Sequence, residues 1–144
     1  MDYKLELVIV PVTDVDRSKH FYSEMLGFHV DVDSSPSEHF RVVQLTPQGS
    51  GCSISIGIGL GDGVPGSLKG LQLCVADIDA AQAELAGRGV AITPVRHHDG
   101  TEFVDGKGGD WNAFAFFDDP DGNSWALQES PTMRAAAEPA ALGS

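Results

Sequence analysis

A short motif occurs twice in this chain and limits the folds that it can adopt. Residues 12–16 read Val-Thr-Asp-Val-Asp and residues 75–79 read Val-Ala-Asp-Ile-Asp, so the pattern V-x-D-[VI]-D recurs 63 positions later. An apolar run precedes each copy and an amphipathic segment follows it, which predicts a strand and then a helix in both places. We interpret the chain as two copies of one small unit. The alternative is a common strand-to-helix junction used twice, since an aspartate suits the N-cap of any helix.

The rest of each half supports the repeat. Both halves carry a turn signal near their ends, Thr-Pro-Gln-Gly at 46–49 and Asp-Pro-Asp-Gly at 119–122. The first half predicts strands at 4–12, 28–32, 40–45 and 53–56, a helix from 13 or 14 to 26, and a polar turn at 34–37. The second half predicts strands at 71–75, 90–95, 111–117 and 124–129, a helix at 77–86, and a long polar loop at 97–110. Each unit therefore reads β-α-β-β-β.

Length and glycine content predict how the units are joined. The 144 residues, of which 42% are hydrophobic, suffice for one domain with a substantial core, which we place at residues 1–130. Residues 57–70 contain six glycines and one proline, which predicts a linker at about 59–68 between unit one (about 4–58) and unit two (about 69–130). Residues 131–144 are rich in alanine and lack a core pattern, so we predict a flexible tail.

Charge and cysteine content exclude several classes of protein. Nine Lys and Arg against 21 Asp and Glu give a net charge of −12, which argues against a nucleic-acid partner. The longest apolar run near the N-terminus, 7–12, is too short to span a bilayer, and no secretory leader is evident. Cys52 and Cys74 lie in apolar runs and read as small buried residues rather than a disulfide pair. We expect a cytoplasmic protein without membrane or nucleic-acid partners.

Two longer segments carry a resemblance to a known family. The segments D-V-D-R-S-K-H-F-Y-S-E-M-L-G-F at 14–28 and F-F-D-D-P-D-G-N-S-W-A-L-Q-E at 116–129 resemble the vicinal oxygen chelate superfamily. Its members include glyoxalase I, bleomycin-resistance proteins, extradiol dioxygenases, fosfomycin-resistance enzymes and methylmalonyl-CoA epimerase. The resemblance covers about residues 4–130. It implies an α+β fold in which two βαβββ units form a curved, eight-stranded mixed sheet, a cup, with the helices on its outer faces.

Enzymes of that family place His, Glu or Gln metal ligands at four strand positions that face the cup. The resemblance carries these positions over to four residues that are not metal ligands: Leu7, Ser53, Gly70 and Ala126. Because a divalent ion needs carboxylate or imidazole donors, we predict no metal and no cofactor. A relocated site near His97, His98 and Glu102 is the alternative. Adjacent residues of an extended chain point to opposite sides, which favours a solvated loop instead.

Strand alternation predicts which side chains line the cup. The Asp-Pro-Asp-Gly turn pairs Asp119 with Asn123, which places Phe116 opposite Ala126. Side chains at every second position then share the inner face, while Trp125 turns toward the helix. The predicted ligand-binding residues are Leu7, Arg41, Ser53, Ser55, Gln72, Phe114, Phe116 and Gln128. Packing of these residues against one another, or at a dimer interface, is the alternative.

Two classes of function remain open. The first is a metal-free binder of a small organic ligand, resembling bleomycin-resistance proteins; aromatic rings and an acidic surface suit a cationic, planar compound. The second is an enzyme of the lyase, isomerase or dioxygenase class, with relocated metal ligands or metal-free acid–base chemistry. No catalytic residue can be named, because no Ser-His-Asp or Cys-His arrangement is visible. We also expect a homodimer, since the resemblance implies one and pairing would cover exposed sheet edges.

Overall fold

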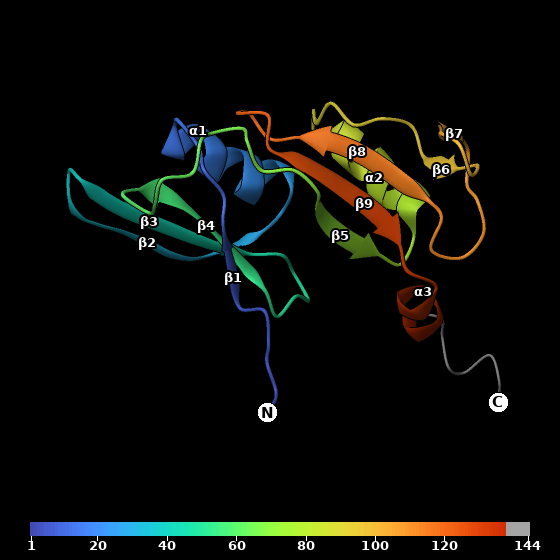
Figure 1. Cartoon of the computed structure of the whole chain (residues 1–144), viewed down its shortest axis with the longest axis horizontal. Coiled ribbons are helices and arrows are strands. Elements are labelled where there is room, and N and C mark those ends of the chain that lie inside the picture. Colours follow the sequence, from blue (N-terminus) through green and yellow to red (C-terminus); the bar gives the residue numbers. More distant parts are fainter. Residues whose placement is uncertain (138–144) are drawn as a thin grey trace. The chain divides into compact units, whose positions relative to one another are not determined.

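The chain divides into two compact units. The structure, a computed structural model, describes residues 1–137 (Figure 1). Unit 1 consists of residues 1–69 together with 118–123, and unit 2 contains residues 70–117 and those from 124 onward. The hairpin turn at 118–123 therefore belongs to unit 1, although the strands that it joins continue in unit 2. No helix within residues 1–137 is long and apolar enough to cross a membrane.

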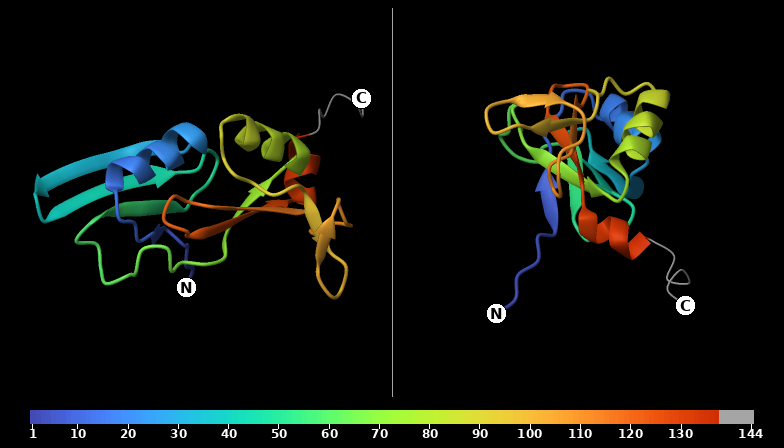
Figure 2. Two further views of the ribbon diagram at one scale, coloured as in Figure 1. Left: turned by 90° about the horizontal axis from the view of Figure 1, so that it is seen from above. Right: turned by 90° about the vertical axis from the view of Figure 1, so that its right-hand side faces the viewer.

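Unit 1 is a four-stranded mixed sheet with a helix on one face. Its elements are β1 (Leu7–Ile9), α1 (Val15–His20), the π-helical turn η1 (Phe21–Met25), β2 (His29–Ser37), β3 (Phe40–Thr46) and β4 (Ser53–Ile58). The strand order is β1-β4-β3-β2, in which β1 runs parallel to β4 and the other neighbours are antiparallel. Figure 2 shows α1 lying along this sheet.

The local chemistry of unit 1 explains where its helix begins and ends. The Asp14 carboxylate accepts a hydrogen bond from the Arg17 N–H (3.1 Å), as an N-cap does. Gly27, with φ of 81°, ends the helical segment in a conformation that favours glycine. The face toward α1 is the core, with Val43 and Ile56 fully buried. Two predictions, the helix from 13 or 14 to 26 and the glycine stop, are confirmed.

The Asp-Pro-Asp-Gly-Asn turn is bound to the chain after β1. The buried Tyr22 hydroxyl donates to Asp119 Oδ2 (2.7 Å), and the Asn123 amide donates to the Pro11 carbonyl (2.8 Å). Thr13 Oγ1 donates to Asp121 Oδ1 (2.6 Å). Asn123 has no exposed surface, so these polar groups are satisfied by protein partners rather than by bulk water. Residues 11–13 are thereby held in place.

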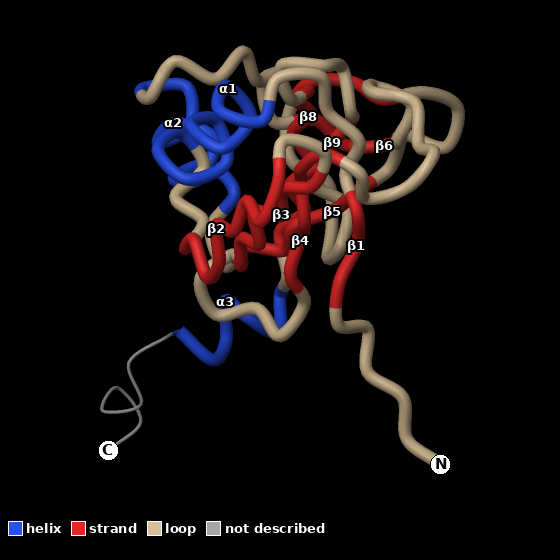
Figure 3. The backbone as a smooth tube through the Cα atoms, turned by 90° about the vertical axis from the view of Figure 1, so that its left-hand side faces the viewer, coloured by secondary structure: helices blue, strands red, loops and turns tan. Residues whose placement is uncertain are grey.

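Unit 2 is a five-stranded mixed sheet with two helices. Figure 3 labels its strands β5, β6, β8 and β9 and its helices α2 and α3. Its elements are β5 (Leu71–Val75), α2 (Ile78–Gly87), β6 (Arg96–His98), β7 (Phe103–Asp105), β8 (Phe114–Asp118), β9 (Ser124–Glu129) and α3 (Pro131–Ala137). The strand order is β5-β9-β8-β6-β7, with β5 parallel to β9. Asp77 caps α2 by accepting from the Ala80 N–H (3.0 Å), so both copies of the repeated motif use their aspartate in the same way.

The core of unit 2 lies between the sheet and α2. Trp125 and Phe117 are each 3% exposed, and their rings stack with centroids 6.2 Å apart and planes 5° apart. Leu127, two residues after Trp125, is 2% exposed, and Ile78 of α2 is fully buried. The prediction that Trp125 turns toward the helix is confirmed.

The α+β fold class with two related units is confirmed, and the strands form two sheets of four and five members. The extra strand comes from the expected polar loop at 97–110, in which β6 and β7 pair as a hairpin. The expected strand at 90–95 is not formed. The sequence prediction missed this hairpin because its residues are polar and its pairing depends on partners elsewhere in the sheet, such as Phe114 opposite Arg96.

Two further segments differ from the prediction. The expected turn at 34–37 is instead the end of β2, where Ser37 pairs with Phe40 and the pairing is irregular between Ser34 and Ser37. An edge strand with a bulge tolerates Pro36, which has no N–H to donate. The first half of the expected tail is helix α3, capped by Ser130 Oγ, which accepts from the Met133 N–H (3.1 Å). Residues 138–144 lie outside the described residues.

Candidate functional site

The face of the unit 2 sheet that is turned away from α2, here called the distal face of unit 2, carries an aromatic cluster. Phe114 and Phe116 alternate with the buried residues of β8, and Phe103 of β7 lies edge-on to both, with centroids 5.6 and 5.0 Å away. The His98 ring lies 5.0 Å from Phe103 in the same edge-on geometry. Phe103 is 43% exposed, so the cluster meets solvent. We call His98, Phe103, Phe114 and Phe116 the aromatic cluster.

The register of the last hairpin matches the sequence prediction. Asp119 N donates to the Asn123 carbonyl (2.9 Å) at the turn, and Glu129 N donates to the Ala113 carbonyl (3.0 Å) at the other end. Both bonds fit one antiparallel register, in which Phe116 lies opposite Ala126.

Three side chains form a hydrogen-bonded group on the distal face of unit 2. The Gln72 amide donates to Gln128 Oε1 (2.5 Å), and the Gln128 amide donates to the Trp111 carbonyl (2.9 Å). Cys74 lies beside Gln128 on the neighbouring strand, with its Sγ 3.7 Å from the same Oε1. These bonds fix which way the Gln128 amide points. Gln72, Phe114, Phe116 and Gln128 therefore share one face, as predicted, although ligand binding by them stays a prediction.

Trp111, whose backbone carbonyl accepts from the Gln128 amide, is a loop residue that the sequence prediction placed inside a strand. It adopts φ of 63°, in the left-handed region that a bulky residue rarely occupies, and its side chain is 47% exposed. The next residue, Asn112, holds the loop by accepting from the His98 N–H (2.8 Å) and donating to the His98 carbonyl (2.9 Å). Gly108 lies so close to Asn112 that a Cβ would come within 2.7 Å of its carbonyl oxygen. The Gly-Gly-Asp run before Trp111 is the signal that could have predicted a loop.

On unit 1, the sheet face turned away from α1, here called the distal face of unit 1, carries predicted residues as well. Leu7 pairs with Ser53 across β1 and β4, and Ser55 follows on the same side of β4. Ser53 Oγ lies 2.7 Å from Thr46 Oγ1, and Thr46 donates a short hydrogen bond to Asp31. The bond from Thr46, followed by that from His29, lowers the pKa of the Asp31 carboxyl. The Thr46 hydroxyl donates its only proton to this carboxylate, so the Ser53 hydroxyl must be the donor in its bond with Thr46.

The expected position of Arg41 is wrong. Its guanidinium binds Asp33 through Nε (3.1 Å) and Nη2 (3.0 Å), and its Nη1 lies 2.9 Å from Asp16 of α1. Arg41 therefore lies on the helix side of the sheet, away from Ser53 and Ser55. The register explains the error, because Gln44 is the β3 residue opposite Ser55, and Arg41 alternates to the other face. The bonds from Arg41, and then Lys19, lower the pKa of Asp33 to about 2.

The residues considered for a metal do not form a donor set. In the pairing of β5 with β9, Gln72 lies opposite Ala126, whereas the resemblance carried the metal-ligand position over to Gly70. Consecutive positions on β6 turn His97 and His98 to opposite faces, where His97 Nδ1 lies 2.9 Å from the Gly106 carbonyl and His98 Nδ1 accepts from the Gly100 N–H (3.1 Å). Across residues 1–137, no three His, Cys, Asp or Glu side chains lie close enough to hold one ion.

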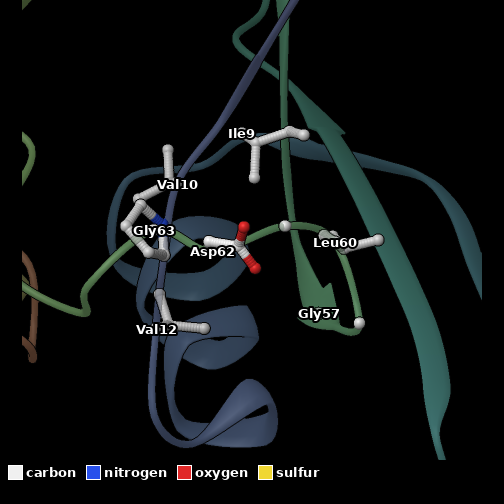
Figure 4. Close-up of a pocket in the computed structure, with 10 residues that line it drawn as sticks. Ile9, Val10, Val12, Gly57, Leu60, Asp62 and Gly63 are labelled. Carbon is white, nitrogen blue, oxygen red and sulfur yellow. The ribbon is translucent and has the colours of Figure 1, made fainter.

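A pocket of about 310 Å³ lies in unit 1, beside the end of β1 (Figure 4). Its lining residues are Ile9, Val10, Pro11, Val12, Gly57, Gly59, Leu60, Gly61, Asp62 and Gly63. None of the eight predicted ligand-binding residues lines it. Sequence reasoning missed this pocket because it interpreted the glycine-rich segment as a linker.

Comparison with known proteins places the chain in a family. The model of the Glyoxalase/Bleomycin resistance protein/Dioxygenase superfamily matches residues 4–127. The chain belongs to this superfamily. The resemblance in the repeated motif and in the last hairpin is thereby confirmed.

Several solved structures of the superfamily are similar to this chain. TnmS3, an antibiotic binding protein from Streptomyces sp. CB03234, is 36% identical, with 90% of this chain and 97% of that chain covered and a TM-score of 0.71. A glyoxalase/bleomycin resistance protein from the same organism is 37% identical, with 87% and 99% covered and a TM-score of 0.67. A superfamily member from Sphaerobacter thermophilus DSM 20745 is 26% identical, with 90% and 98% covered and a TM-score of 0.72. No curated protein matches the chain.

Proposed function

We propose that this superfamily member binds a small, planar aromatic compound on the distal face of unit 2 and acts by sequestering it. The observation that carries the proposal is the aromatic cluster. Phe103 stands edge-on to two rings that are themselves parallel within 8°, and it remains 43% exposed. Aromatic rings in such a cluster offer both faces and edges to a flat ligand. That a protein 36% identical is an antibiotic binding protein supports the same reading.

The polar groups around the cluster suggest how a ligand would be oriented. Gln72 uses its amide nitrogen on Gln128, which leaves its carbonyl oxygen as an acceptor. His98 Nδ1 accepts from the Gly100 N–H, so a neutral His98 ring carries its proton on Nε2 and presents a donor. The net charge of −12 favours a cationic ligand over an anionic one through long-range attraction. Rings and amides supply these contacts, so the proposed binding requires no metal ion.

Fluorescence titration tests this proposal. Trp111 is 47% exposed and its backbone carbonyl accepts from the Gln128 amide on the distal face, whereas Trp125 is 3% exposed on the other face, so a planar dye bound at the cluster should quench mainly Trp111. We expect a cationic acridine to quench saturably and a tetraalkylammonium ion of equal charge to have no effect. Trp111→Phe assigns the signal.

Two phenylalanines provide a matched pair of variants for the titration. Phe103→Ala should weaken acridine binding about tenfold, since loss of one or two ring contacts costs roughly 1.4 kcal/mol. Phe40 of unit 1 is 41% exposed, nearly the same as Phe103, so Phe40→Ala is the control and should leave the affinity unchanged. Equal losses in both variants, or turnover of the compound by the protein, would contradict the proposal.

We also propose that the protein is a homodimer. The support is topological: each sheet has two edge strands, β1 and β2 in unit 1 and β5 and β7 in unit 2, and pairing between chains is a common way to cover edges. Light scattering should give twice the mass of the 15.2 kDa chain at micromolar concentration. A monomer mass across that range would refute this.

A further inference from the structure

We propose a second binding site, in the unit 1 pocket, for a small organic cation in which an ammonium group is attached to an apolar body. The pocket has about 310 Å³, within the range of small-molecule sites, and its lining comes from two segments of unit 1 alone. It shares no residue with the aromatic cluster. The proposal therefore stands apart from the function proposed above.

One wall of the pocket is the chain that leaves β1. Val10 is 1% exposed and donates its N–H to the Ser55 carbonyl (2.9 Å), which ties this wall to β4. The Pro11 carbonyl accepts from the Asn123 amide (2.8 Å). Val12 is followed directly by Thr13, whose hydroxyl is bonded to Asp121. The first wall is thus fixed at three successive points before any ligand arrives.

The opposite wall is the segment 57–63, and three of its four glycines, Gly57, Gly59 and Gly63, are required by close packing. A Cβ on Gly57 would come within 1.8 Å of the Arg41 carbonyl oxygen. At Gly59, where φ is 77°, a Cβ would come within 2.7 Å of the His39 carbonyl oxygen. A Cβ on Gly63 would press on the Pro11 ring at 3.1 Å. Contacts at positions 57, 59 and 63 hold this wall, so the pocket is preformed.

The chemistry of the lining selects the ligand. Apart from glycine, the lining consists of aliphatic side chains, proline and a single charged residue, Asp62. Figure 4 shows the Asp62 carboxylate between the chain segment that bears Val10 and Val12 and the part of the opposite wall that bears Leu60. Within residues 1–137, no hydrogen bond or ion pair engages this carboxylate. An apolar surface with one free negative charge is complementary to an organic ammonium ion.

Three cations of unit 1, Arg17, Arg41 and Lys69, are bound to partners other than Asp62. Arg41 binds Asp16 and Asp33, and Lys69 Nζ donates to the Gly122 carbonyl (2.9 Å). Arg17 lies 3.6 Å from Asp121. These contacts leave the Asp62 charge to be met by solvent or by a cationic ligand.

Nuclear magnetic resonance of the ¹⁵N-labelled chain tests the proposal with two probes of the same shape. Benzylammonium carries the charge, and benzyl alcohol is its neutral counterpart. We expect benzylammonium to shift the amide signals of Ile9, Val10, Val12 and 57–63 saturably, and benzyl alcohol to leave them unchanged. Added salt should weaken the binding, because Asp62 is exposed and its field is screened.

Two charge-removing variants complete the test. Asp62→Asn should weaken benzylammonium binding about fivefold, the upper range for one solvent-accessible ion pair. Glu38→Gln removes the same charge from a carboxylate that is 86% exposed on another loop, and should stay within about twofold of the parent. Equal binding of benzyl alcohol, an unchanged affinity in Asp62→Asn, or no saturation at low millimolar concentration overturns the proposal. Shifts confined to the aromatic cluster overturn it too, and would locate the cation at the other site.

Discussion

Trp125 and Phe116 lie on adjacent strands of the last hairpin and on opposite faces of the sheet, which allows a sharp test of the facing assignment. Trp125 is 3% exposed and stacks on Phe117 beneath α2. Phe116 is half-buried on the distal face, with its ring 5.0 Å from Phe103. We expect Trp125→Ala to destabilise the fold and Phe116→Ala chiefly to weaken ligand binding.

The sizes of the two effects follow from burial. A buried tryptophan removes roughly 250 Å² from water, and truncation to alanine costs about 3 to 5 kcal/mol, including the cavity left behind. For a chain of this size, each kcal/mol lowers Tm by about 3 °C, so Trp125→Ala should lose about 9 to 15 °C. Phe116→Ala gives up an edge-on contact with Phe103 and a stacked contact with Phe114, about 0.5 to 1.5 kcal/mol each, with partial refilling by solvent, and should lose about 3 to 6 °C.

Thermal unfolding followed by circular dichroism measures both losses, and the acridine titration measures binding in the same samples. Phe116→Ala should bind acridine about tenfold more weakly while remaining folded at 25 °C, through the ring contacts that it removes. Trp125→Ala, if folded at that temperature, should keep the parent affinity. Similar Tm losses for both variants would refute the assignment of the two residues to different faces.

Three more predictions concern charge and metal. The Glu129 carboxylate accepts hydrogen bonds from the Ile78 N–H (3.1 Å), Lys107 (3.0 Å) and Arg134 (2.6 Å). Burial raises the pKa of Glu129, but the bonds from Ile78 and Lys107 outweigh this effect, so the pKa is lowered. Glu129→Gln should lower the free energy of unfolding, measured with urea at neutral pH, by about 2 kcal/mol, and this loss should shrink as the pH falls below 4.5. A comparable loss at every pH would contradict the dependence on Glu129 ionisation. Because the pKa of Asp33 is about 2, Asp33→Asn should lower the free energy of unfolding by about 1 kcal/mol above pH 3.8 and by progressively less toward pH 2. Urea titrations at several pH values would check this. Elemental analysis should find no stoichiometric transition metal, and a chelator should leave Tm unchanged; one ion per chain that His98→Ala abolishes would contradict this.

Sequence reasoning predicted the fold well where the deciding signals are local. Asp14 and Asp77 each start a helix as an N-cap, because a side-chain carboxylate three residues from a free N–H is a property of the local chain. The last hairpin was predicted to its register, since the Asp-Pro-Asp-Gly turn fixes the pairing and alternation fixes the faces. The same two rules placed Phe114, Phe116 and Gln128 on one face.

Prediction was poorer where a residue's position depends on a distant strand. The facing of Arg41 required the β3–β4 register, which no tight turn of known type fixes, because residues 47–52 separate these strands. Trp111 is held outside a strand by Asn112 and Gln128, whose partners become neighbours only after the sheet has formed. The pocket beside β1 likewise depends on close contacts between the glycine segment and residues 11, 39 and 41.

The sequence by itself determined the repeat, the helix starts and the alternation along the last strands. Hydrophobic periodicity and helix capping depend on residues only a few positions apart in the chain, so they can be recognised without the tertiary structure. Tertiary structure decided that Pro36 lies in an edge strand, that 96–105 is a hairpin, and that residues 57–63 wall a pocket instead of linking the units freely. In each of these cases the backbone partner lies elsewhere in the sheet. Local propensity differs by only about 1 kcal/mol per residue, so hydrogen bonds and packing supplied by distant strands outweigh it.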